Sequence, residues 1–204
     1  MKFSISRIIF MPLTLLALVA CGGESAGTIN EADLVDMVQG PADAPAILIE
    51  YASTTCPACA HYHETMGETI KQLAEEGKLR FVFREYPRDA VDIAGFTTAR
   101  CAGEEKYFDV LADLFKNQAG LAASARNGTV RSSLQAIAQR HGVDAAKFEA
   151  CLSDETISTQ ISNSLNYAVE IGVGGTPALY FNGAELPTEG RTPESLISLI
   201  ETVN

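Results

Sequence analysis

The stretch that decides the fold is residues 47–63, ILIEYASTTCPACAHYH. Its apolar start is typical of a strand, and after Cys56 and Cys59 apolar residues recur three or four positions apart, which predicts a helix. Unpaired N–H groups and the macrodipole at a helix N-terminus favour an anion. With Pro57 in the first helical position, we expect the Cys56 thiol to have a pKa below the ordinary value of about 8.5.

Two further features extend the pattern around this dithiol. Glu50 lies six residues before Cys56, and Thr176–Pro177 lies in the segment GVGGTPALYFNG. Together with the Cys-x-x-Cys, they resemble the active site of the thioredoxin fold and, more narrowly, of the DsbA-like thiol–disulfide oxidoreductases. The resemblance covers roughly residues 40–203 and includes a long Ala-rich segment like the family's helical insert. It implies an α/β, thioredoxin-like fold with an inserted all-helical domain.

The resemblance also implies a role for each residue. Cys56 attacks a client sulfur and forms a mixed disulfide, which Cys59 resolves. Glu50 accepts the proton of Cys59, because a buried carboxyl has a raised pKa that suits proton exchange. Thr176 and Pro177, with a cis peptide bond, pair with an extended client chain. The alternatives are a solvent-exposed carboxylate at the sheet edge and an ordinary turn before a strand.

Pro57 and Ala58, between the two cysteines, are expected to contact the substrate and to tune the reduction potential. Ala58 stands where the strongest oxidases of the family carry His, which can stabilise the thiolate. Each pKa unit represents about 1.4 kcal/mol, and for a two-electron couple that corresponds to about 30 mV. We therefore expect an oxidising protein that is milder than the family's extreme.

A metal site is the alternative use of these cysteines. His63 could join Cys56 and Cys59 as a third ligand, but no second Cys-x-x-Cys completes a closed zinc site. We expect His61 and His63 to lie on an exposed helix face, and we expect no metal and no cofactor.

The N-terminus predicts export and lipidation. Lys2 and Arg7 precede an apolar run over residues 8–20, the pattern of a secretory signal. The sequence LVAC, which ends at Cys21, resembles the bacterial lipobox, in which the Cys is acylated. An ordinary signal peptide with a chance Cys is the alternative. This pattern predicts a lipoprotein anchored to the membrane of the cell envelope, facing the periplasm.

The cysteine count agrees with lipidation, because five is an odd number for an exported protein. If Cys21 carries lipid, Cys101 and Cys151 remain beside the dithiol. We expect Cys101 and Cys151 to form a structural disulfide, because an oxidising compartment keeps such bonds. It would close a loop of about fifty residues and contribute about 4 kcal/mol to stability. Two free core thiols are the alternative.

The chain is predicted to divide into five parts. They are a signal peptide (1–20), a tether with a short helix near 31–38 (21–40), the first part of the core (41–88), the insertion (89–171) and the second part of the core (172–204). Within the insertion we expect five helices, near residues 90–102, 104–118, 130–140, 144–152 and 155–171.

Charge and segment lengths limit the partners. Removing residues 1–20 takes the formal charge from −11 to −13, which argues against nucleic acid or an anionic membrane surface as a partner. We expect exported client proteins with reduced or mispaired cysteines and a membrane redox partner. We also expect a monomer, because residues 31–38 are too few for an oligomerising stalk. The rival functions are a disulfide isomerase or reductase, a metal-handling lipoprotein, and a structural scaffold with an inert disulfide.

Overall fold

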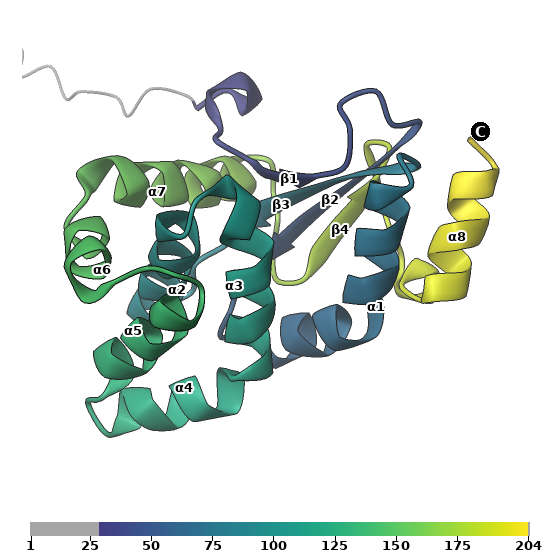
Figure 1. Cartoon of the computed structure of the whole chain (residues 1–204). Helices are drawn as coiled ribbons and strands as arrows, with labels where there is room; N and C mark the ends of the chain where they lie inside the picture. The colour runs from purple at the N-terminus through teal and green to yellow at the C-terminus, as the bar shows by residue number, and fades with distance from the viewer. Residues whose placement is uncertain (1–28, 204) are drawn as a thin grey trace, which may run out of the picture.

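The computed structural model describes residues 29–203, and this part of the chain contains one mixed five-stranded sheet in the order β1-β3-β2-β4-β5 (Figure 1). Its strands are β1 (Met37–Gln39), β2 (Ala46–Ala52), β3 (Leu79–Glu85), β4 (Ala178–Phe181) and β5 (Ala184–Glu185). β2 pairs in parallel with β3, and the other pairs are antiparallel. β2 is therefore a central strand, and the chain leaves it directly into the Cys-x-x-Cys.

Helix α1 (Pro57–Glu75) follows β2, and the local sequence explains both of its ends. Cys56 is the N-cap and Pro57 the first helical residue, where a missing N–H costs nothing. Gly77 follows the helix with a φ of +72°, the left-handed conformation that commonly ends a helix. Buried residues of α1 recur at helical spacing and form its core face: Cys59, Tyr62, Met66, Ile70 and Leu73.

The C-terminal part completes the core around α1. Asn182 and Gly183, both with positive φ, form the two-residue turn between β4 and β5, as an Asn-Gly pair predicts. Helix α8 (Pro193–Glu201) packs against α1. Its N-cap is Thr192, whose hydroxyl accepts a hydrogen bond from the Ser195 N–H at 3.2 Å.

Six helices lie between β3 and β4 and gather on one side of the molecule (Figure 1). They are α2 (Ala90–Cys101), α3 (Glu104–Lys116), α4 (Gln118–Arg126), α5 (Val130–Arg140), α6 (Ala145–Leu152) and α7 (Glu155–Glu170). Asp89, Asp144 and Asp154 cap α2, α6 and α7 through their carboxylates, as residues of this type do.

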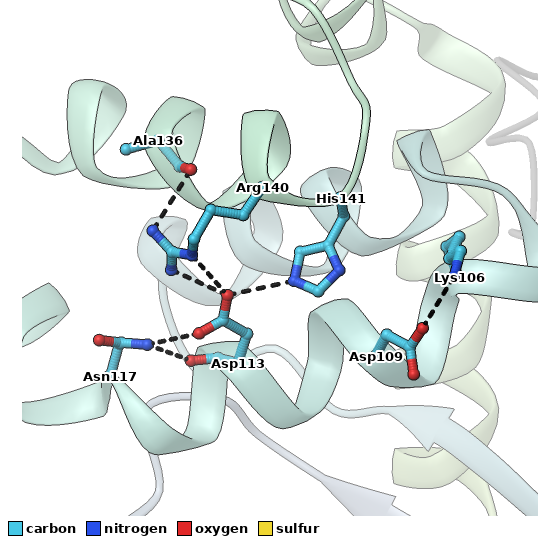
Figure 2. A network of polar contacts seen from close by, with 7 residues as sticks. All are labelled: Lys106, Asp109, Asp113, Asn117, Ala136, Arg140 and His141. Carbon is cyan, nitrogen blue, oxygen red and sulfur yellow. Dashed lines mark hydrogen bonds and ion pairs between the residues drawn. The ribbon is translucent and has the colours of Figure 1, made fainter.

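Bonds between distant segments hold these helices together and to the sheet. Cys101 of α2 and Cys151 of α6 form a disulfide across 50 residues of sequence. At the surface, Asp113 of α3 accepts hydrogen bonds from Arg140 Nη2 at 2.8 Å and from His141 Nε2 at 3.1 Å, which ties the end of α5 to α3 (Figure 2). The Arg140 side chain is half exposed, and ion pairs with exposed side chains contribute at most about 1 kcal/mol.

Two predictions of local structure were wrong. The expected helix near 31–38 is a 3-10 turn, Glu31–Asp33, followed by β1. A helix of two turns is marginal by itself, whereas β1 gains the edge of β3 as a hydrogen-bonding partner. No helix was expected over residues 119–129, whereas α4 spans Gln118–Arg126 and includes Gly120. A helical glycine costs only about 1 kcal/mol, and Leu121 gains a buried position.

Candidate active site

The Cys56–Cys59 dithiol lies at the start of α1, with both side chains buried. Cys56 is 6% exposed and Cys59 is 0% exposed. The Cys56 Sγ donates a hydrogen bond to the Thr176 carbonyl oxygen at 3.3 Å, so the structure brings the dithiol and the Thr176–Pro177 segment together. Pro57 and Ala58 are exposed beside them.

The two thiols have opposite pKa shifts. Burial raises the pKa of Cys56, but hydrogen bonds with the Thr176 side chain and with the Cys59 and Ala58 backbone outweigh it and lower the pKa overall. Burial raises the pKa of Cys59 strongly, and the nearby charge of Glu50 raises it further. Because the thiolate is the nucleophile, Cys56 is equipped to attack and Cys59 holds its proton.

The segment before β4 forms the opposite wall of the site. The Thr176–Pro177 peptide bond is cis. Arg191 links this segment to the chain after β5, because its Nη1 donates a hydrogen bond to the Pro177 carbonyl at 3.3 Å and its Nε donates one to the Leu186 carbonyl at 3.2 Å. A recess of about 410 Å³ is lined by residues 172–178 together with Tyr180, Glu185 and Arg191.

Asp92 of α2 anchors the loop that precedes Cys56, and sequence reasoning missed it. Its fully buried carboxylate accepts hydrogen bonds from the hydroxyls of Ser53 at 2.7 Å and Thr54 at 2.6 Å. It also accepts from the Thr55 N–H and the Arg88 N–H, both at 2.8 Å, and from the Thr55 hydroxyl at 2.9 Å. The polar run Ser-Thr-Thr was the only local signal, and it does not name its partner.

Gln118 of α4 is the second anchor that the sequence did not indicate. Its Nε2 donates to the Thr54 carbonyl at 2.7 Å and to the Cys56 carbonyl at 3.0 Å. The inserted helices therefore hold the loop before Cys56 through Asp92 and Gln118. Gln118 was missed because α4 itself was not predicted.

Glu50 lies on β2 with no solvent exposure, so the sheet-edge alternative for its position does not apply. One carboxylate oxygen, Oε2, is 2.9 Å from His63 Nε2. The expectation that His63 lies on an exposed face was wrong, since its side chain is 12% exposed and stacks on Phe115 with ring centroids 4.2 Å apart. Four residues after Cys59, His63 shares its helix face. His61 is exposed, as expected.

Two properties of the described residues concern metal binding and membrane crossing. Within residues 29–203, no three His, Cys, Asp or Glu side chains are placed to hold a metal ion. No helix in the same range has the length and apolar character to cross a membrane. The predicted signal peptide and Cys21 lie outside the described residues.

Comparisons with known proteins agree with this geometry. A protein of Rickettsia bellii named "Putative protein-disulfide oxidoreductase" is 30% identical over 168 residues, which are 81% of this chain and 63% of that protein. A relative of the same description from Rickettsia prowazekii is 32% identical over 81% of this chain and 60% of its own length. The chain thus spans about three fifths of the length of these relatives.

Solved structures confirm the predicted fold class. The crystal structure of Wolbachia pipientis α-DsbA1 superposes with a TM-score of 0.73 at 24% identity, covering 86% of this chain and 96% of that chain. This likeness shows an α/β thioredoxin-like fold with an inserted helical region. The family model described as "Thioredoxin" matches residues 33–202. The chain belongs to the thioredoxin family.

Proposed function

We propose that this chain is a DsbA-type protein dithiol–disulfide oxidoreductase that introduces disulfides into exported proteins through its Cys-Pro-Ala-Cys motif. The observation that carries the proposal is the opposite pKa shift of two adjacent thiols, lowered at Cys56 and raised at Cys59. A structural pair of cysteines has no need of this asymmetry, whereas thiol–disulfide exchange needs one good nucleophile and one reserved thiol. The names of the Rickettsia relatives support the same activity.

The reaction begins with the Cys56–Cys59 disulfide. A client thiolate attacks Cys56 Sγ, the Cys56–Cys59 bond breaks, and Cys59 leaves with the electron pair and takes up a proton. A second client thiolate then attacks the client sulfur of the mixed disulfide, and Cys56 leaves as a thiolate. Two electrons have passed from the client to the enzyme dithiol. The lowered pKa of Cys56 makes it the better leaving group in the last step.

Glu50 is proposed as the proton donor and acceptor for Cys59. It is fully buried, and its charge acts on the Cys59 thiol. A carboxyl group in such a place can exchange a proton with a sulfur that water does not reach.

Client binding is proposed at the exposed Pro57 and Ala58 and along Thr176 and Pro177. An extended client chain can pair with the backbone of this segment as an added strand, and Thr176 and Pro177 also line the 410 Å³ recess. Such pairing recognises backbone and not sequence, which suits an enzyme with many clients.

The same proposal places the protein in the cell envelope, anchored by acylated Cys21 and facing the periplasm, where oxidising conditions keep disulfides. A membrane redox partner would take the electrons from the reduced dithiol. We propose that the protein acts as a monomer, because the segment before β2 contributes its only described strand, β1, to its own sheet.

The test compares two single-cysteine variants. Cys56→Ser should abolish oxidation of a reduced client, because the Cys56–Cys59 disulfide, whose Cys56 sulfur the client attacks, can no longer form. Cys59→Ser should accumulate mixed disulfides with clients, which non-reducing electrophoresis resolves. The control is the double variant Cys101→Ser with Cys151→Ser, which should oxidise the client at the normal rate. Normal oxidation by Cys56→Ser would overturn the proposal, and faster repair of scrambled client than oxidation of reduced client would indicate an isomerase.

A further inference from the structure

The pair formed by Glu50 and His63 has a role that the proposed function does not yet use. Glu50 Oε2 lies 2.9 Å from His63 Nε2. The other oxygen, Oε1, is buried, and no described residue offers it a hydrogen bond. A buried polar atom without a partner is uncommon and costs about 1–3 kcal/mol. Oε1 can therefore accept a proton without first giving up a hydrogen bond to a described residue.

His63 connects this buried carboxylate with a groove on the surface. Its ring lies between Phe115 of α3, stacked at 4.2 Å, and the edge of Phe83 at 5.9 Å. The same side chain lines a groove of about 700 Å³ between α1 and α3, which Pro57 also lines next to the dithiol. One side of His63 thus meets Glu50 in the core and the other side meets space that solvent can reach.

The chemistry requires a route for a proton at this point. Cys59 is 0% exposed, and Glu50 is equally inaccessible. Every cycle nevertheless adds one proton to the Cys59 sulfur and removes one. Glu50 can store that proton but cannot exchange it with water directly, so a third group must connect it with solvent.

We propose that His63 exchanges a proton with the groove each time Glu50 gains or loses one, so that Cys59, Glu50 and His63 form a relay; this inference rests on the proposed function. His63 does not touch the sulfurs, so it acts through Glu50. Histidine suits the task because its unperturbed pKa is about 6.5 and its ring has two nitrogens that accept and release protons.

The steps balance when the reduced enzyme is reoxidised. Cys56 is first joined to the oxidant in a mixed disulfide. Cys59 gives its proton to Glu50, its thiolate bonds to Cys56 Sγ, and the oxidant's sulfur leaves as a thiolate with the electron pair. The proton from Cys59 stays on Glu50 Oε1, and His63 keeps its Nε2 proton in the hydrogen bond to Oε2. Because the carboxyl group beside it is now neutral, the His63 imidazolium releases its Nδ1 proton to the groove. Client oxidation runs the same route in reverse and delivers a proton to Cys59.

The competing role for His63 is to stabilise Glu50 by a hydrogen bond alone. Glutamine separates the two roles, because its amide can donate a hydrogen bond to Glu50 but cannot carry a proton. Alanine leaves a hole beside Glu50, and the groove is large enough to admit a free imidazole molecule. The matched control is His61→Ala, which removes an exposed histidine from the same helix and the same groove.

The experiment follows a single turnover of the mildly reduced protein with oxidised glutathione, quenched with acid and read by intact mass. It separates attachment of glutathione to Cys56 from closure of the Cys56–Cys59 disulfide. Attachment should be equal in all variants. Closure should slow about tenfold or more in His63→Gln and His63→Ala and stay normal in His61→Ala. This is less than the roughly 10²–10⁴-fold contribution of a direct general acid or base, because His63 acts through Glu50. Added imidazole should accelerate closure in His63→Ala and leave the wild type unchanged.

Normal closure in His63→Gln, or no response of His63→Ala to imidazole, would overturn the relay. If neither variant folds, the wild type decides: closure that is equally fast in D₂O and H₂O would also overturn it. Failure of the proposed function has a different appearance, because the wild-type protein would then neither attach glutathione nor close its disulfide.

Discussion

Replacing Asp92 by Asn tests whether the inserted helices hold the loop before Cys56. The buried carboxylate accepts five hydrogen bonds, two on Oδ1 and three on Oδ2, and each oxygen serves one backbone N–H. Thr55 N–H contacts Oδ1 and Arg88 N–H contacts Oδ2. In either orientation of an Asn side chain, its NH₂ group would replace one of the two oxygens and face a backbone N–H. Two donors would then point at each other, because a backbone N–H cannot rotate to become an acceptor.

The expected loss follows from this count. A hydrogen bond to a charged acceptor contributes about 1.5–3 kcal/mol, and a buried donor left without an acceptor costs about 1–3 kcal/mol. The hydroxyls of Ser53 and Thr54 can rotate to find another acceptor, so the main loss of stability comes from the one backbone N–H that is left without an acceptor. We expect Asp92→Asn to lower the free energy of unfolding by about 3 kcal/mol, on the scale of one lost charged hydrogen bond. Urea unfolding of the oxidised protein measures this value.

Asp144→Asn provides the matched control. Asp144 caps α6 by accepting from the Lys147 N–H at 2.8 Å, and Asn is as good an N-cap as Asp. The same chemical change should therefore cost less than about 0.5 kcal/mol there. If Asp92→Asn destabilised the protein no more than Asp144→Asn does, the anchoring by Asp92 would be refuted.

Three other predictions concern the cysteines. Because the pKa of Cys59 is raised in the folded protein, only the unfolded thiol ionises just above the ordinary thiol pKa. The reduced protein should therefore lose about 1.4 kcal/mol of unfolding free energy per pH unit in this range. Urea unfolding should show this loss in the wild type and not in Cys59→Ser. The lowered pKa of Cys56 acts with opposite sign and adds stability as the pH rises from the folded to the unfolded value. Replacing Cys101 and Cys151 by Ser should lower the free energy of unfolding by about 4 kcal/mol, because their disulfide closes a loop of 50 residues in the unfolded chain. Peptide mapping of the wild-type protein that finds either thiol free would contradict this. Cys21→Ser should release the protein from the membrane fraction, and an unmodified Cys21 in intact mass spectrometry would argue against lipidation.

The sequence alone determined those features whose causes lie within a few residues. The start of α1 at Cys56 and Pro57, the cap at Thr192 and the Asn182-Gly183 turn depend on backbone groups next to them in the chain. A thiol at a helix start was expected to have a lowered pKa, and the backbone of Cys59 and Ala58 contributes to this lowering at Cys56. The largest lowering contribution, however, comes from the Thr176 side chain, which only the tertiary structure brings to Cys56. The resemblance that these segments carry supplied the fold class, which the comparison with solved structures confirms.

Only the tertiary structure decided the partners of the buried polar groups. Asp92 lies 37 residues from Thr55 and Glu50 lies 13 residues from His63, so no local pattern shows that they meet. A buried carboxylate must find hydrogen-bond donors wherever the fold supplies them. The same reason explains why residues 37–39 became β1: their partner was the edge of β3, which exists only once the sheet has formed.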